Sequence, residues 1–265
     1  MKHSVAVLVA THSRALLLRR RTIPSILSQT VSPRVVVIVN DGAPHSPAVQ
    51  HELAGLAGRT DLKLLNNSRS PGAAGAWNTG LQWLYGQGFD GFVAMLDDDD
   101  TWDPHHLATN TQAAAAAGAA IAVSGLRLKR DGRLLPRSLI ERLSYTDFLV
   151  GNPGWQGSNT FVRIAALEAI GGFDEQLPSM HDRDIAVRLL RHSGVSRVLV
   201  PDWTATWFLG TPGCLTARSA SKLVALRRFL AKHGALMGEA ERGAYLERAQ
   251  RLFGITQAEI ECRPD

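Results

Sequence analysis

The stretch that decides both the fold and the site is GFVAMLDDDDTWDPHHL, residues 91–107, in which an apolar run leads directly into four consecutive aspartates. A short apolar run without polar alternation is typical of a strand that is covered on both faces of a sheet. Four adjacent carboxylates repel one another, so we expect positive charge near the end of this strand to offset the repulsion.

Comparable apolar runs recur along the chain, and they occupy residues 4–10, 34–40, 62–66, 120–126 and 195–201. Segments of helical composition lie between them, at residues 14–30, 71–86 and 104–118. Pro24 predicts that the first of these helices is kinked or restarts there. The alternation predicts an α/β fold with a parallel sheet.

The pattern loosens after residue 130. The Asp-Gly pair within residues 129–133 predicts a tight turn, and residues 152–159 form a loop rich in turn-forming residues. The stretch from Thr216 to Glu261 has mostly helical composition.

Composition limits the class of protein. The chain has 265 residues, 45% of them hydrophobic, which suits one large domain or one domain with an extension. The formal net charge of +5 favours anionic ligands. Cys214 and Cys262 are too few for a disulfide framework or a zinc site, so a reducing cytoplasm is expected. The apolar run near the N-terminus is short for a signal peptide, and we interpret it as a strand.

The aspartates after residue 96 have two interpretations. Ligands of open α/β sheets bind at the carboxyl ends of strands, so Asp97–Asp100 could hold a divalent cation together with substrate phosphates. The alternative is an acidic turn that caps the helix expected to begin near Pro104.

Two further groups of carboxylates occupy comparable places. Asp41 follows the strand at residues 34–40, where it could accept a hydrogen bond from a nucleobase or form a local turn. Asp182 and Asp184 stand at the start of a helical pattern. A carboxylate there could serve as a general base or cap the helix.

Taken in order, six segments resemble the family 2 glycosyltransferases, which have the GT-A fold: VAVLVATHSR, VVVIVNDGA, GAAGAWNTGL, MLDDDDTWDP, GSNTFVRIAALEAIGGFDE and HDRDIAVRLLR. The resemblance covers roughly residues 4–192. It implies a Rossmann-like, mostly parallel central sheet flanked by helices, with residues 1–215 as the GT-A domain. Within that domain it implies a nucleotide-binding half over about 1–128 and an acceptor-side half over about 129–215, followed by a helical C-terminal extension at 216–265.

The resemblance also implies an activity, the inverting transfer of a sugar from a nucleotide-sugar donor to a hydroxyl of a glycan, lipid-linked or small-molecule acceptor, as in bacterial polysaccharide biosynthesis. It implies Asp182 as the catalytic base, and Asp97 and Asp99 as ligands of Mg²⁺ or Mn²⁺. The residues that it assigns to the nucleotide are Thr11, His12, Arg14, Asp41, Gly75, Asn78, Asp97 and Asp98.

The chain departs from the family pattern at several positions. Trp77 stands where the family commonly has an arginine, so an expected cationic contact to the nucleotide is missing and the donor is uncertain. His181 replaces the usual glutamate of an acidic dyad, and Asn40 replaces a frequent aspartate. The histidine that often lies near the end of the domain has no obvious counterpart in residues 204–216. We expect a UDP-sugar in preference to a GDP- or dTDP-sugar.

Acceptor recognition is expected at residues 152–159, where Trp155 could stack on a sugar and Gln156 could bind hydroxyls, with His181 nearby. The alternative for Trp155 is a packing role. Arg19–Arg21 form either a solvated face or a contact with anionic lipid or phosphate, which leaves peripheral membrane contact open. Nucleic-acid binding is not expected, because no recognisable module accompanies the charge. A nucleotidyltransferase and a non-catalytic sugar-binding protein stay as alternative functions.

Overall fold

The computed structural model describes residues 4–56, 60–210 and 218–262. Its strands are β1 (Val5–Thr11), β2 (Val35–Asn40), β3 (Asp61–Asn66), β4 (Phe92–Asp97), β5 (Thr101–Trp102), β6 (Ile121–Arg130), β7 (Arg133–Leu135), β8 (Thr160–Arg163) and β9 (Arg197–Phe208). Its main helices are α1 (Ala15–Leu17), α2 (Ile23–Leu27), α3 (Pro47–Leu56), α4 (Ala73–Gly86), α5 (His106–Ala117), α6 (Tyr145–Val150), α7 (Ile164–Ala169), α8 (His181–Arg191), α9 (Ala220–His233), α10 (Glu239–Phe253) and α11 (Gln257–Glu261).

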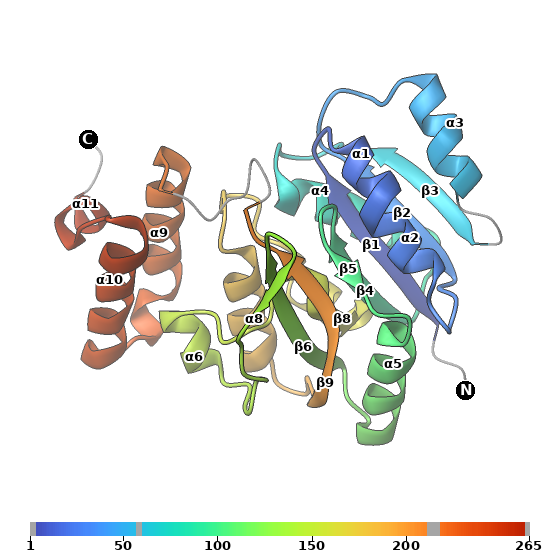
Figure 1. Cartoon of the computed structure of the whole chain (residues 1–265). Helices are drawn as coiled ribbons and strands as arrows, with labels where there is room; N and C mark the ends of the chain where they lie inside the picture. Colours follow the sequence, from blue (N-terminus) through green and yellow to red (C-terminus); the bar gives the residue numbers. More distant parts are fainter. Residues whose placement is uncertain (1–3, 57–59, 211–217, 263–265) are drawn as a thin grey trace.

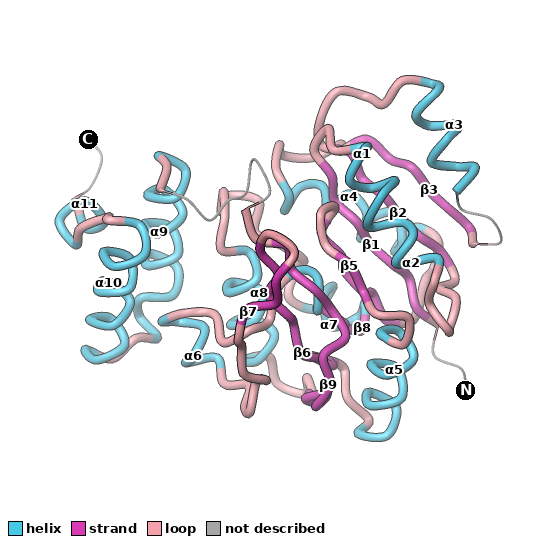
Figure 2. The backbone as a smooth tube through the Cα atoms, in the orientation of Figure 1, coloured by secondary structure: helices cyan, strands magenta, loops and turns pink. Residues whose placement is uncertain are grey.

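One curled sheet runs through the molecule in the order β3-β2-β1-β4-β8-β6-β9-β5, with β7 paired to β6 (Figures 1 and 2). The first four strands of this order are parallel, as the apolar runs predict. β8 then lies antiparallel to both β4 and β6, and β6 pairs with β9 in parallel. The α/β prediction is confirmed, and the sheet is mixed beyond β4.

Helices cover both faces of the sheet, which explains the continuous apolar runs. Alternate residues of β1 enter two separate cores, Leu8 on one face and Val7 on the other. α4, α8, α9 and α10 contribute to the first core, and α2, α3 and α5 to the second. A strand that is buried on both faces has no solvated side, so no polar alternation appears in its sequence.

Two local predictions needed refinement. The helix expected over residues 14–30 is α1, a π-helical segment η1 (Leu18–Thr22) and α2, so the helix type changes beside Pro24. β3 is the edge strand of the sheet and is largely exposed rather than buried. α3 and β8 had no clear signal in the sequence. The turn at Asp131 and Gly132 does form the hairpin that links β6 and β7, with φ values of 50° and 78°.

The C-terminal helices lie on the opposite side of the molecule from α3 and β3 (Figure 1). Phe229 of α9 and Tyr245 of α10 are buried in the same core as Leu8 of β1. The extension is therefore joined to the sheet domain by a continuous core, and the division at residue 215 stays a prediction. Cys214 and the predicted boundary lie outside the described residues. Within the described parts of the chain, no helix combines the length and the apolar character needed to cross a bilayer.

Candidate active site

The candidate site lies where the parallel strands end at their carboxyl edge. The register pairs Ala10 of β1 with Asp97 of β4, and Thr11 of β1 with Asn40 of β2. The last residues of three neighbouring strands therefore lie side by side. This is the edge at which ligands of open α/β sheets bind.

A hydroxyl group at the end of β1 and a guanidinium group just after it hold the middle of the acidic turn. The Thr11 hydroxyl donates a hydrogen bond of 2.7 Å to Asp98. Arg14 Nη1 lies 3.0 Å from Asp98 Oδ1 and 3.1 Å from Asp99 Oδ2. Three residues that the sequence assigned to nucleotide binding, Thr11, Arg14 and Asp98, thus contact one another directly.

Asp100 faces the interior and has a structural role. It is 1% exposed. Its carboxylate accepts hydrogen bonds from the Ser158 hydroxyl and, at 2.9 Å, from the Phe208 amide. Burial, followed by the charge of Asp99, raises the pKa of Asp100 to about 8, although these hydrogen bonds oppose the rise. Asp100 therefore connects the acidic turn to β9 and to the loop before β8.

Asp97 is partly buried and lies against the backbone of Gly157. A Cβ atom at position 157 would come within 2.8 Å of Asp97 Oδ1, so the side chain of any other residue would displace this carboxylate. Burial raises the pKa of Asp97 well above its usual range, and the charges of Asp100, Asp182, Asp99 and Asp98 raise it further. A cation bound here would relieve that repulsion.

Asp182, the second residue of α8, reaches the same edge of the sheet from a helix that comes much later in the sequence. Asp182 accepts a hydrogen bond from the Gly157 backbone, and Asp97 lies against the same residue, so both carboxylates border Gly157. Burial raises the pKa of Asp182 to about 7, while a hydrogen bond with the Gly157 backbone and the charge of Lys222 lower it. At neutral pH such a carboxyl group exchanges its proton readily, as a general base must.

A divalent cation fits this group of residues when a ligand supplies part of its coordination. In the part of the chain that the structure describes, no cluster of three or more His, Cys, Asp or Glu side chains is arranged to hold a metal ion. Mg²⁺ is commonly bound by one or two carboxylates together with substrate phosphates and water. Asp97 and Asp99 would supply those carboxylates, and a cation at Asp99 would compete with Arg14 for the same carboxylate.

Asp41 ties together the loop that follows β3. Its two oxygens accept hydrogen bonds from Asn67 Nδ2 at 2.6 Å and from the Gly72 amide at 2.8 Å. His12 Nδ1 lies 3.5 Å from Asp41 Oδ2, and the His12 side chain is 72% exposed. Asp41 therefore fastens the loop after β3 instead of forming a local turn with its own backbone, and its side chain is 10% exposed beside His12.

Gly75 and Asn78 lie in the first two turns of α4, where both contact other residues of the protein. A Cβ atom at Gly75 would lie 1.9 Å from the Ser70 carbonyl oxygen, so the backbone approach requires glycine. Asn78 is buried and exchanges hydrogen bonds with the Phe173 backbone at 2.8 and 2.9 Å. It also donates to Glu175 at 2.7 Å. In this structure, then, Asn78 holds the segment that leads to α8.

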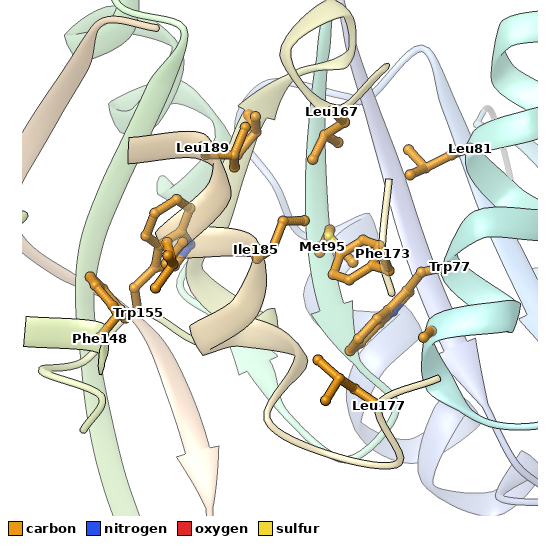
Figure 3. Close-up of a cluster of buried hydrophobic side chains, with 14 of the residues drawn as sticks. Trp77, Leu81, Met95, Phe148, Trp155, Leu167, Phe173, Leu177, Ile185 and Leu189 are labelled. Atoms are coloured by element: carbon orange, nitrogen blue, oxygen red, sulfur yellow. The ribbon is translucent and has the colours of Figure 1, made fainter. Parts of the chain in front are cut away.

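Two of the residues expected to bind the acceptor are buried. Trp155 is 1% exposed, its indole N–H donates to Thr160 Oγ1 at 2.9 Å, and Figure 3 shows it beside Phe148. It therefore has the packing role that the sequence left as the alternative. His181 is 7% exposed and makes a 2.7 Å hydrogen bond through Nε2 with the Leu177 carbonyl. Burial lowers the pKa of His181, which keeps it neutral.

Gln156 is the partly exposed member of the predicted acceptor group. Trp77, which replaces the arginine common in the family, is buried, with its ring 4.7 Å from that of Phe173 (Figure 3). The Trp77 ring also lies 5.6 Å from that of His181. Two of the departures from the family pattern, Trp77 and His181, thus pack against each other.

Arg21 is a site residue that the sequence did not identify. Its Nη1 donates a 2.7 Å hydrogen bond to the Asp99 carbonyl, and its guanidinium lies 3.9 Å from the centre of the Phe208 ring. Arg19 forms an ion pair with Glu52. These two members of the basic cluster have partners within the protein rather than forming a uniform solvated face. No local signal distinguishes them, because the contacts join residues far apart in sequence.

Comparison with known proteins tests the family that the sequence resembles. The sequence model described as "Glycosyl transferase family 2" matches residues 6–170. Two proteins of Rhizobium meliloti (strain 1021) are similar over shorter stretches. The succinoglycan biosynthesis protein ExoW is 38% identical over 90 residues, which is 33% of this chain and 27% of ExoW. The succinoglycan biosynthesis protein ExoO is 33% identical over 132 residues, which is 49% of this chain and 36% of ExoO. The matches thus span about a quarter to a third of these relatives.

Solved structures share the fold at low sequence identity. TarS from S. aureus, residues 1–349, in complex with UDP-GlcNAc, superposes with a TM-score of 0.68 at 16% identity over 98% of this chain and 76% of that one. The mannosyltransferase PcManGT from Pyrobaculum calidifontis, in complex with GDP-Man and Mn²⁺, gives 0.63 at 19% identity over 95% of this chain and 70% of that one. The family match covers more than half of the chain, which therefore belongs to glycosyl transferase family 2.

Proposed function

We propose that the protein is a metal-dependent, inverting glycosyltransferase that moves a sugar from a nucleotide-sugar donor to a hydroxyl group of an acceptor. One observation carries the proposal: Asp97, the first residue of Asp97–Asp99, and Asp182 both lie beside Gly157 at the ligand edge of the sheet. This arrangement would bring a leaving-group site and a base together.

The roles follow from the charges. Asp97 and Asp99 would hold Mg²⁺ or Mn²⁺, which supplies positive charge to the departing diphosphate. Asp182 would take the proton of the acceptor hydroxyl as that oxygen attacks the anomeric carbon. The bond to the diphosphate breaks at the same centre through an oxocarbenium-like transition state, which inverts the configuration. No covalent intermediate is required.

Donor and acceptor classes are proposed from the relatives. TarS is known in complex with UDP and with UDP-GlcNAc, and PcManGT with GDP-Man. We favour a UDP-sugar, bound at Thr11, His12 and Asp41. The two Rhizobium relatives act in succinoglycan biosynthesis, so we infer a glycan or lipid-linked glycan acceptor in polysaccharide assembly. We place the reaction in the cytoplasm, with peripheral contact at the inner face of the membrane.

A ligand panel tests the proposal. Thermal unfolding is measured with UDP-, GDP-, dTDP- and CMP-sugars, each with and without Mn²⁺, since a ligand that binds the folded state raises its stability. We expect a UDP-sugar to stabilise the protein only when Mn²⁺ is present. Asp97→Asn should lose that stabilisation, whereas Asp90→Asn, an exposed carboxylate, should keep it. If no nucleotide sugar stabilises the protein with any metal, the proposal fails.

A further inference from the structure

The base candidate is held by a turn that has an unusual backbone. Met180 precedes α8 and has a φ of 70°, a left-handed conformation that is uncommon for a residue other than glycine. No side-chain hydrogen bond caps α8 at this position. The surrounding structure must therefore fix the turn and the direction in which Asp182 leaves it.

Polar contacts of buried residues on both sides of Met180 provide that support. On the C-terminal side, His181 bonds to the Leu177 carbonyl at 2.7 Å. On the N-terminal side, the buried Ser179 hydroxyl accepts a 3.0 Å hydrogen bond from Lys222 Nζ. Lys222 belongs to α9, beyond the family match, which ends at residue 170.

The buried position of Lys222 requires a negatively charged partner. Lys222 is 6% exposed, and burying an ammonium group costs free energy unless the group is paired. The Ser179 hydroxyl and the Phe253 ring, whose centre lies 5.1 Å from Nζ, are its neutral neighbours. Burial and then the charge of Arg183 lower the pKa of Lys222 to about 8, while the charge of Asp182 raises it. The charge of Lys222 in turn lowers the pKa of Asp182.

The rest of α8 shows why α9 can act on Asp182. Asp184, two residues further along, binds His233 Nε2 at 2.8 Å and Lys232 Nζ at 2.7 Å, both from the end of α9. The two helices are thus fastened together at Asp184, with Lys222 at the opposite end of α9 beside Ser179. α9 is held in place independently of the contact to Ser179.

We propose that Lys222 is a positioning residue for the reaction: its buried ammonium group holds Ser179 and compensates the charge of Asp182, so that the C-terminal helix α9 completes the site. This inference rests on the proposed function for the role of Asp182. The electrostatic coupling of Lys222 to Asp182 can be measured without any assumption about the substrate.

The first experiment is a double-mutant cycle on stability, with Lys222→Met, Asp182→Asn and the double variant unfolded by urea at pH 7.5 in the presence of a chelator. We expect Lys222→Met to lower the folding equilibrium constant at least about fivefold more in the wild-type background than in the Asp182→Asn background. Lys232→Met is the matched control, because this lysine lies on the same helix but pairs with Asp184 and Asp174. It should not couple to Asp182→Asn. Additive effects of Lys222→Met and Asp182→Asn would overturn the proposal.

The second experiment measures release of nucleoside diphosphate from UDP-glucose, UDP-GlcNAc, UDP-galactose and GDP-mannose with Mn²⁺, with water as the acceptor. Lys222→Met and the milder Ser179→Ala should lower kcat, by about tenfold for Lys222→Met, with the donor KM within twofold of the wild-type value. Wild-type kcat in Lys222→Met would overturn the inference. Wild-type kcat in Asp182→Asn would instead overturn the proposed base, and the stability cycle would still decide whether Lys222 is coupled to Asp182.

Discussion

Replacing Asp182 by asparagine should stabilise the metal-free protein while it abolishes transfer. Burial raises the pKa of this carboxyl group from 3.8 to about 7. Its folded-state pKa is thus above the unfolded value, so the unfolded chain releases its proton first and the stability of the folded state falls as the pH rises from about 4 to about 7. At about 1.4 kcal/mol for each pH unit, the cost above pH 7 is at most about 4 kcal/mol.

Asparagine has the same shape and can still accept the hydrogen bond from the Gly157 backbone, but it carries no charge. Urea unfolding in the presence of a chelator should therefore give equal stabilities for the wild type and Asp182→Asn near pH 4. By pH 8 the free energy of unfolding of the variant should exceed that of the wild type by up to about 4 kcal/mol. The exposed control Asp90→Asn should follow the wild type throughout. A variant no more stable than the wild type at pH 8 would refute the assignment of Asp182 as a buried carboxyl group whose ionisation lowers the stability of the fold.

Transfer should fall at least about 100-fold in the same variant, since general bases contribute roughly that factor or more. This loss would accompany a gain in stability, so misfolding could not explain it. Donor binding, measured by calorimetry with Mn²⁺, should be retained. Loss of donor binding along with turnover would point to a binding role for Asp182 rather than a catalytic one.

Three further predictions concern groups around the acidic turn. Gly157→Ala should displace the Asp97 carboxylate and weaken Mn²⁺-dependent donor binding about tenfold with little change in stability, as titration calorimetry would show, and unchanged binding would contradict the close contact. Arg21→Met should lower the free energy of unfolding by about 1–3 kcal/mol, because it leaves the Asp99 carbonyl without its charged donor; urea unfolding at pH 7 would detect this, and Arg20→Met is the neighbouring control. Glu175 has a pKa of about 2 because hydrogen bonds from Asn78, Arg69 and Ser70 outweigh the effect of burial, so its contribution to stability should be present above pH 4.5 and disappear as the pH falls towards 2. Glu175→Gln should remove that pH dependence in the same assay.

The sequence predicts the parallel half of the sheet well because those strands are covered on both faces. β1, β2 and β4 are continuous apolar runs that each end in one polar residue, as expected of strands buried on both faces. β8 has only the four residues Thr160–Arg163 and follows a polar loop, so its antiparallel insertion beside β4 depends on tertiary contacts. Short strands of this kind carry too little periodicity to be identified from sequence.

For the site, the strand-end rule predicts where the carboxylates gather but not which of them have partners. Asp182 and Asp184 look equivalent at the start of α8. They are two residues apart, about 200° around a helix, so they face different neighbours. Asp184 turns to His233, Arg188 and Lys232, and these contacts hold its pKa well below its usual range although burial opposes them. Arg188 is the i+4 neighbour of Asp184, but His233 lies 49 residues away in sequence, beyond any local pattern.

The partners of the five carboxylates, Asp97–Asp100 and Asp182, bear on the function of the site. Asp98 has Thr11 and Arg14, Asp99 has Arg14, and Asp100 has Ser158 and the Phe208 amide. Asp97, Asp100 and Asp182 keep strongly raised pKa values, so the fold is less stable than it would be with neutral groups at these positions. Asp100 is turned to its own donors in the interior, whereas Asp97 and Asp182 lie beside Gly157 at the ligand edge, where positive charge from outside the chain would reduce that cost. A divalent cation with its diphosphate would supply that charge at Asp97, and an acceptor proton would supply it at Asp182.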